Sequence, residues 1–163
     1  MKYLYAPWRS DYIDKDRKDE SQDSKSCPFC FKKNDDKKKD EYLLYQSKHA
    51  FVMMNRFPYN AGHLMVIPYE HKKYLYDLSK EEQHDCIDLL SMSSEIVQKS
   101  LKAEGVNIGA NIGKAAGGSI EGHLHFHVLP RWIGDTSFLP VLSETKQVSF
   151  DLKEIYKKLK KEF

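Results

Sequence analysis

The sequence has no apolar run near the roughly 20 residues that a membrane-spanning helix needs, and no hydrophobic signal core follows Met1. It has only three cysteines in 163 residues, which is too few for a disulfide framework. Its formal net charge of +2 is too small to make a nucleic acid the main partner. We therefore expect a cytoplasmic, reduced protein without membrane or nucleic-acid partners, whose free thiols are available to bind a metal.

The length and composition predict one domain. A chain of 163 residues, with 40% hydrophobic and 31% charged residues, can bury one core and is short for two. Two charged segments, 14–26 and 32–41, are typical of solvated loops. We expect a single domain, 1–163, in which 1–41 form an N-terminal arm with a Cys-x-x-Cys segment, 42–140 form the core and 141–163 form a C-terminal helix region.

Hydrophobic periodicity predicts an α+β fold with an antiparallel sheet. Ser79 and Glu82 form an S-x-x-E capping box, which predicts the start of a long helix that ends near Glu104. The last predicted helix is amphipathic, and its apolar stripe covers either its own sheet or that of a neighbouring copy. In chain order, we expect strands at 42–46, 50–54 and 63–68, a helix at 79–104, a strand at 106–112, a strand through 123–128 and a helix at 151–163.

Residues 122–132 read GHLHFHVLPRW, so that histidines alternate with apolar residues. Because a strand has a period of two, we expect the apolar side chains to enter a core and the three histidines to line one small site: His123, His125 and His127. Three imidazoles can hold a catalytic zinc ion together with a water molecule. Alternatively, one imidazole acts as a nucleophile while the others position the substrate. The third alternative is a polar strand face without chemistry.

The segment just before these histidines, Gly117, Gly118 and Ser119, favours the nucleophilic alternative. Small residues let backbone N–H groups approach an anion closely, and a serine hydroxyl adds a donor, as in a phosphate cradle. An imidazole with a pKa near 6.5 is largely neutral and nucleophilic at cellular pH. It can attack phosphorus and form a phosphoramidate, which water or inorganic phosphate then releases. The other ring nitrogen must carry a proton that is held by an acceptor.

The stretch 118–132 resembles the motif of the histidine-triad (HIT) superfamily, in which three histidines alternate with apolar residues. The resemblance looks greatest to the bacterial branch related to diadenosine tetraphosphate (Ap4A) phosphorylases and Fhit-type dinucleoside polyphosphate hydrolases. It implies a HIT-like α+β fold, with an antiparallel sheet of about five strands, a long helix and a C-terminal helix. The resemblance extends to the segments 8–9, 27–30, 55–68, 111–113 and 134–136.

The resemblance implies a role for each histidine of the triad. His125 is then the nucleophile that attacks the α-phosphorus, and His127 lies near the scissile phosphate and the leaving oxygen. His123 helps to fix the geometry, and its backbone carbonyl accepts the proton of His125. A histidine rather than a glutamine at position 127 favours the hydrolase-like and phosphorylase-like branches over the transferase branch. The resemblance also implies phosphate contacts by Asn111, Gly118 and Ser119, a ribose contact by Asn55, and nucleotide contacts by His63 and Trp132, although His63 could equally be a core histidine and Trp132 could equally serve packing.

Cys27 and Cys30 have a spacing that suits two thiolates on one zinc ion, but a structural site needs two more ligands. HIT proteins with an N-terminal Cys-x-x-Cys resemble this chain in placing a histidine shortly after an Ile-Pro strand end. By that resemblance, the ligands of a structural zinc ion are Cys27, Cys30, His71 and His123.

The sequence therefore predicts a HIT-type enzyme that cleaves a nucleotide phosphoanhydride through a His125–AMP intermediate. The expected substrate is Ap4A or a related dinucleoside polyphosphate, with phosphorolysis or hydrolysis as the second step. No metal is expected to be needed at the phosphorus. The resemblance also implies a homodimer. Two alternatives stay open: a three-histidine zinc hydrolase, and an adenine-nucleotide-binding module without catalysis.

Overall fold

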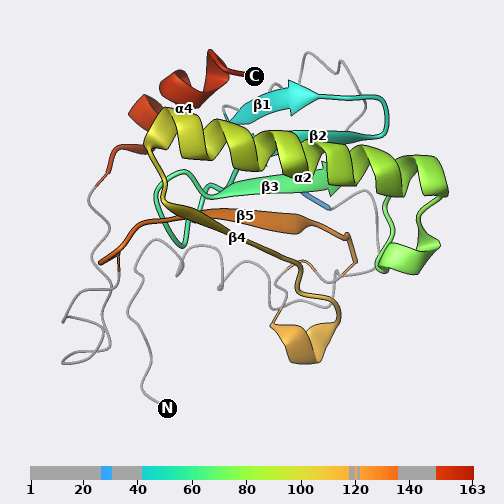
Figure 1. Ribbon diagram of the computed structural model, residues 1–163. Coiled ribbons are helices and arrows are strands. Elements are labelled where there is room, and N and C mark those ends of the chain that lie inside the picture. Colours follow the sequence, from blue (N-terminus) through green and yellow to red (C-terminus); the bar gives the residue numbers. More distant parts are fainter. Residues whose placement is uncertain (1–26, 31–41, 118–119, 121, 136–149) are drawn as a thin grey trace.

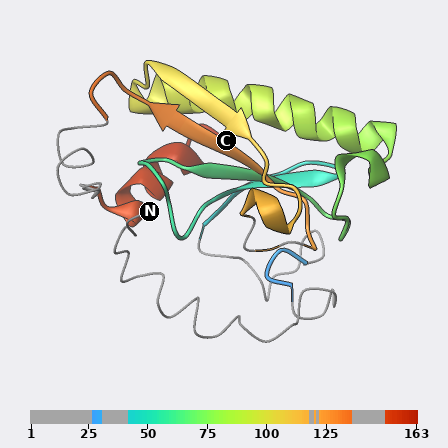
Figure 2. The same ribbon diagram turned by 90° about the horizontal axis from the view of Figure 1, so that it is seen from below.

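A computed structural model of the protein describes residues 27–30, 42–117, 120, 122–135 and 150–163. Its centre is a five-stranded antiparallel sheet with the strand order β1-β2-β3-β5-β4. Helix α2 lies across one face of this sheet, and the short segment 27–30 lies on the opposite face (Figures 1 and 2). The expected α+β fold with about five strands, a long helix and a C-terminal helix is confirmed. The elements are β1 (Leu43–Gln46), β2 (Ala50–Met54), β3 (Leu64–Pro68), the 3-10 turn η3 (Leu75–Asp77), α2 (Lys80–Leu101), β4 (Gly105–Gly109), the 3-10 turn η4 (Lys114–Ala116), β5 (Phe126–Arg131) and α4 (Leu152–Lys160).

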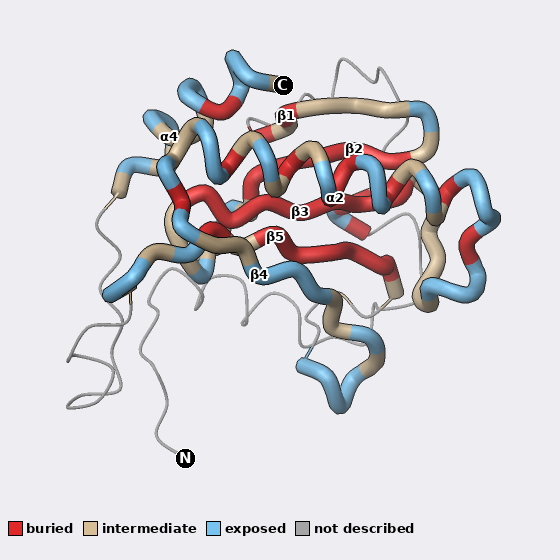
Figure 3. Tube along the Cα trace, in the orientation of Figure 1, coloured by how far each residue is buried: buried red, intermediate tan, exposed pale blue. Residues whose placement is uncertain are grey.

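The central strands β2 and β3 are buried along their whole length, as Figure 3 shows. Because successive side chains of a strand point to opposite faces, each of these strands contributes to two clusters. Val52 and Val66 belong to the larger cluster under α2 and α4, while Met53 and Met65 belong to a smaller cluster that includes Cys27 and Phe29. The sheet therefore has a covered face on both sides, and the second cover is the Cys-x-x-Cys segment.

Helix α2 begins where the sequence predicts and ends earlier. Ser79 accepts a hydrogen bond from the backbone N–H of Glu82, and the Glu82 carboxylate accepts one from the Ser79 N–H at 2.6 Å. This reciprocal pair satisfies two N–H groups that the first turn cannot pair internally. The helix ends at Leu101 rather than near Glu104, because Lys102 is in the left-handed conformation (φ 54°). β4 begins at Gly105, one residue before the predicted strand.

Two strands have other bounds than the sequence predicts. β4 ends at Gly109 rather than at residue 112, and β5 begins at Phe126, so that His123 and His125 precede the strand rather than lying within it. The alternation of faces is still kept, because the apolar residues between the histidines enter the core under α2: Leu124, Phe126 and Val128.

Helix α4 covers its own chain. Leu159 is fully buried in the core under α2, and the Tyr156 hydroxyl donates a hydrogen bond to the carbonyl of Leu43 on the edge strand β1 at 3.1 Å. The apolar stripe of this helix is therefore not left for a neighbouring copy. Among the described helices, none has the length and apolarity to cross a membrane.

Candidate active site

The three histidines lie together at the beginning of β5, between β3 and β4. His127 pairs with Met65 of β3 and with Gly109 of β4, so it occupies the middle of the sheet. The ring centroids of His125 and His127 are 5.0 Å apart. All three side chains are buried, with exposed fractions of 1% for His123, 6% for His125 and 8% for His127. Three imidazoles in the interior need partners, and these partners determine what each ring can do.

The His125 ring is held with one nitrogen committed and the other available. Its Nδ1 lies 2.9 Å from the backbone carbonyl oxygen of His123. Because a carbonyl can only accept, Nδ1 carries the proton and donates it, and Nε2 therefore carries the lone pair. Burial lowers the pKa of His125, which favours the neutral imidazole, although the bond to the His123 carbonyl acts in the opposite direction. The ring is chemically competent as a nucleophile through Nε2.

The neighbouring ring, His127, is joined to His63. The backbone N–H of Tyr59 donates to His63 Nδ1 at 3.2 Å, so the proton of the His63 ring is on Nε2. His63 Nε2 then donates to His127 Nδ1 at 2.9 Å, which leaves the proton of His127 on Nε2. That Nε2 is buried and has no hydrogen-bond partner within the described part of the chain. Burial, and secondarily His125, lowers the pKa of His127 to about 4, so the ring is neutral at pH 7.

The sequence left two alternatives for His63, a nucleotide contact or a core histidine. In the structure it is a core histidine that also bonds to His127. His63 is fully buried, and its ring stacks on Tyr59 with centroids 5.0 Å apart. It is satisfied at both nitrogens, as a core histidine must be, yet one of those bonds sets the tautomer of His127. The strand register accounts for this contact, because Met65 pairs with His127 and the residue two before Met65 lies diagonally across from His127.

A second group of side chains forms a metal-binding arrangement next to the histidines. The ligand atoms of Cys27, Cys30, His71 and His123 all lie within 4.8 Å of one another. The Cys27 and Cys30 sulfurs are 3.4 and 3.5 Å from His123 Nδ1, and the Cys30 sulfur is 3.1 Å from His71 Nδ1. Two thiols and two imidazoles are a donor set that suits a closed tetrahedral zinc site.

His123 is oriented for this group and not for the other two histidines. Its Nε2 donates to the carbonyl of Pro68 at 2.8 Å, so the lone pair is on Nδ1, which faces the two sulfurs. A backbone carbonyl that fixes the second nitrogen is the usual support for a metal-binding histidine. Burial lowers the pKa of His123 to about 4, so the ring is in the neutral form that binds metals. His123 therefore contributes its backbone carbonyl to His125 and its ring to the cysteines.

Phe29 joins the two groups, and sequence reasoning missed it. Its ring packs at 5.1 Å from the His125 ring and at 5.8 Å from the His123 ring. The available signal was its position between the two cysteines. An aromatic residue in so short a segment has to pack wherever the cysteines are held.

Three of the other expected site residues lie in the described part of the chain: Asn55, Asn111 and Trp132. The Asn55 amide group lies 3.3 Å from His63 Nδ1, and its oxygen accepts the N–H of Phe57. Asn111 is half-buried, two residues after the end of β4. The Trp132 indole N–H donates to the carbonyl of Lys102 at 2.9 Å, which agrees with a role in packing. A contact between the Trp132 ring and a nucleotide stays a prediction. Gly118 and Ser119 lie outside the described residues, as does the Trp8-Arg9 arm.

Known proteins of the histidine-triad type are similar to this chain in sequence. The family model described as the HIT domain matches residues 36–132, which is more than half of the chain. An AP-4-A phosphorylase of Mycobacterium tuberculosis is 31% identical over 153 residues, covering 91% of this chain and 77% of the relative. A bis(5'-adenosyl)-triphosphatase of Saccharomyces cerevisiae is 30% identical over 93 residues, covering 56% of this chain and 45% of that protein.

Solved structures share the fold. The crystal structure of a Zn-bound histidine triad family protein from Mycobacterium smegmatis superposes with a TM-score of 0.61 at 29% identity. The match covers 74% of this chain and 81% of that one. The family model, a relative matched over most of both lengths and the paired histidines all agree. This chain is therefore an enzyme that belongs to the HIT domain family.

Proposed function

We propose that this enzyme cleaves a phosphoanhydride of a dinucleoside polyphosphate, such as Ap4A, through a covalent His125–AMP intermediate. One observation carries the proposal: the His123 carbonyl holds the proton of His125 on Nδ1, so that the lone pair is on Nε2 beside a second, neutral histidine. The names of the relatives support the substrate class, because one is an AP-4-A phosphorylase and another a bis(5'-adenosyl)-triphosphatase.

In the first step, Nε2 of His125 attacks the α-phosphorus. A P–N bond forms while the P–O bond to the leaving nucleotide breaks, and the leaving oxygen takes the electron pair. His127 Nε2–H donates a hydrogen bond to a phosphoryl or leaving oxygen, because its other nitrogen already accepts from His63. In the second step, the oxygen of water or inorganic phosphate attacks the phosphorus, the electron pair of the P–N bond returns to Nε2 of His125, and the proton of the attacking oxygen passes to solvent. The proposed nucleotide contacts are Asn55, Asn111, Gly118, Ser119 and Trp132, while His63 acts through its bond to His127.

The test compares His125→Ala with His84→Ala, which changes an exposed histidine of α2. Each protein is incubated with Ap4A, with and without inorganic phosphate, and the products are identified. We expect His84→Ala to retain turnover, and His125→Ala to lose it while still binding nucleotide. ATP plus ADP indicates phosphorolysis, and ATP plus AMP indicates hydrolysis.

Rapid quenching followed by mass spectrometry, under conditions that preserve acid-labile P–N bonds, should detect AMP on His125 in the wild type. Near-full activity of His125→Ala, or rapid conversion without any adduct, contradicts the nucleophilic mechanism. Tight nucleotide binding by the wild type with no product identifies the non-catalytic binding module instead.

The Cys27, Cys30, His71 and His123 group binds a structural zinc ion in this proposal. It is the metal-binding group found among the described residues, and it contains only one histidine of the triad. This favours the nucleophilic mechanism over the three-histidine zinc hydrolase. We expect Cys30→Ser to lower both the zinc content measured by elemental analysis and the melting temperature, whereas Cys86→Ser, outside the group, leaves the zinc content unchanged. Loss of turnover on chelation, with folding unaffected and no His125 adduct in the wild type, would support the zinc hydrolase.

The enzyme acts as a cytoplasmic homodimer, in which residues 1–163 of each subunit form a single domain. The support for the dimer is the edge strand β4, where Ile108 is 51% exposed. An exposed edge strand with an apolar side chain can pair with another copy. Analytical ultracentrifugation tests this against the chain mass of 19.1 kDa, and Ile108→Lys should shift the protein towards the monomer.

A further inference from the structure

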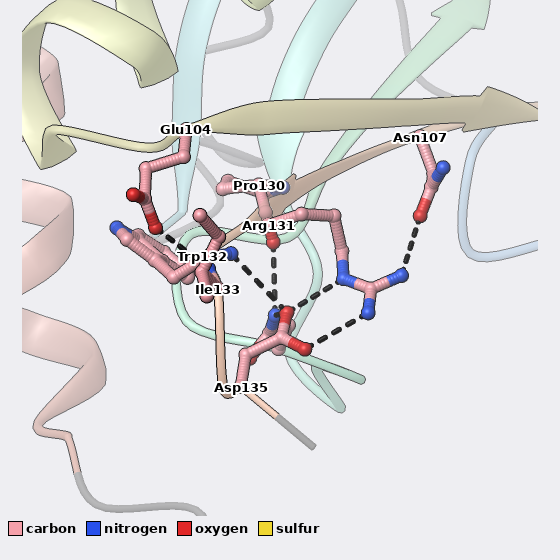
Figure 4. A network of polar contacts seen from close by, with 8 residues as sticks. Glu104, Asn107, Pro130, Arg131, Trp132, Ile133 and Asp135 are labelled. Carbon is pink, nitrogen blue, oxygen red and sulfur yellow. Dashed lines mark hydrogen bonds and ion pairs between the residues drawn. The ribbon is translucent and has the colours of Figure 1, made fainter.

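Asp135 is a nearly buried carboxylate that follows β5 and gathers donors from two segments of the chain. Its side chain is only 8% exposed. Arg131 donates to it twice, from Nε at 2.6 Å and from Nη2 at 2.8 Å, and the Trp132 N–H donates at 3.4 Å (Figure 4). Arg131 is in turn fixed to β4, because its Nη1 donates to the Asn107 side chain at 2.7 Å. A carboxylate held by a guanidinium fork has a well-defined orientation.

A further donor to Asp135 comes from the loop that precedes β3. The Asn60 amide donates to Asp135 at 3.0 Å and to the carbonyl of Pro130 at 2.8 Å. These two bonds attach the loop to the end of β5, some 70 residues away in the sequence. We call Asn60, Arg131 and Asp135 the clasp.

The loop that the clasp holds is the one that fixes the tautomer of His63. Tyr59, the neighbour of Asn60, donates its backbone N–H to His63 Nδ1 and stacks its ring on the imidazole. The backbone carbonyl of Asn60 itself accepts the N–H of His63 at 3.1 Å. Two donors hold the His63 proton on Nε2, the Tyr59 N–H and the Asn55 amide at 3.3 Å. A displaced loop would therefore withdraw one of them and weaken the bond that keeps the His127 proton on Nε2.

We propose that Asn60 and Asp135 are positioning residues, which act through Tyr59 and His63 to keep the N–H of His127 directed at the substrate. The proposal rests on the proposed function, in which His127 donates to the phosphoryl or leaving oxygen. The proposal assigns a role to Asp135, whose carboxylate accepts hydrogen bonds from Asn60, Arg131 and Trp132. A small misplacement of such a donor can lower the rate about 100-fold, even when its cause is distant from the reacting atoms.

The test uses Asn60→Ala and Asp135→Asn in the full-length protein with its metal. Asn60→Ala removes the amide and keeps the backbone carbonyl, and Asp135→Asn places an amide N–H₂ opposite the Arg131 fork. The control is Asp85→Asn, which removes a carboxylate that accepts the Ser47 hydroxyl and the His49 N–H at a distant hairpin. Imidazole ¹⁵N spectra report which ring nitrogen carries each proton, and steady-state kinetics report kcat and KM.

In the wild type and in Asp85→Asn, we expect His63 and His127 to be protonated at Nε2 and His125 at Nδ1. In Asn60→Ala and Asp135→Asn, we expect a second tautomer of His63 and His127 and an unchanged His125. We also expect kcat to fall about 10- to 100-fold with KM within about threefold. The double variant should lose no more activity than the more affected single variant, because both changes act through one contact.

Unchanged tautomers of His63 and His127 in both clasp variants would overturn the proposal, whatever happens to activity or stability. The same holds if Asp85→Asn alters these tautomers as much. Failure of the proposed function is recognised separately, by the absence of a His125 adduct in the wild type. The spectra of the clasp variants still decide the positioning role in that case, since they need no turnover.

Discussion

Gly62 allows the sharpest stability prediction, because its backbone and its surroundings both oppose a side chain. Its φ is +69°, a left-handed conformation that costs an L-residue about 1–2 kcal/mol. A Cβ at this position would lie 2.3 Å from Cδ1 of Leu101, at the end of α2, and 3.4 Å from Cγ of Pro130. Since Cδ1 is the end of a flexible side chain, the crowding falls at the low end of the usual overpacking cost, about 1 kcal/mol.

The lower entropy of the unfolded chain offsets part of the backbone strain, so the free energy of unfolding of Gly62→Ala should be about 2 kcal/mol below that of the wild type. The comparison is Gly117→Ala, where φ is +80° but a Cβ would meet no described atom within 4 Å. That change should cost about 1 kcal/mol, since the strain is partly offset by the lower entropy of the unfolded chain. Urea unfolding at fixed zinc concentration gives both values, provided that the m-values agree.

A double variant isolates the steric part of the cost. In a Leu101→Ala background the methyl group that Gly62→Ala would meet is gone, so the Gly62 change should cost no more than the Gly117 change. The reasoning is refuted if Gly62→Ala costs as much in that background as in the wild type, or if both glycine changes cost the same.

Two further outcomes follow from burial. The pKa of His127 is lowered to about 4 in the folded protein, against about 6.5 in the unfolded chain, so the unfolded state binds more protons between these values and stability should fall as the pH drops from 6.5 towards 4. His127→Gln should lose less unfolding free energy than the wild type between pH 7 and pH 5 in urea titrations at equal metal load, and equal losses would show that His127 is not responsible. Leu159→Ala, at a fully buried position of α4, should cost about 2–4 kcal/mol in the same assay, whereas Leu75→Ala, at a position 43% exposed, should cost under about 1 kcal/mol. Equal costs for the two leucines would mean that α4 does not pack on its own chain.

Local chemistry in the sequence determined the elements and their order. The Ser79–Glu82 capping box starts α2 because the two groups are three residues apart and need no distant partner. The continuous apolar runs at 50–54 and 64–68 form strands that are buried on both faces, and the alternation after His123 puts Leu124 in the core. Element ends were less predictable, since the left-handed Lys102 that stops α2 carries no sequence signal comparable to a glycine.

The tertiary structure alone decided what each histidine can do. An imidazole acts as donor, acceptor or metal ligand according to which partners reach its two nitrogens, and these partners come from distant segments. Pro68 and the cysteines turn the His123 ring away from the other two histidines, while Tyr59 and His63 place the proton of His127. The sequence carries the three rings on one short stretch, and only the folded chain gives each a different role.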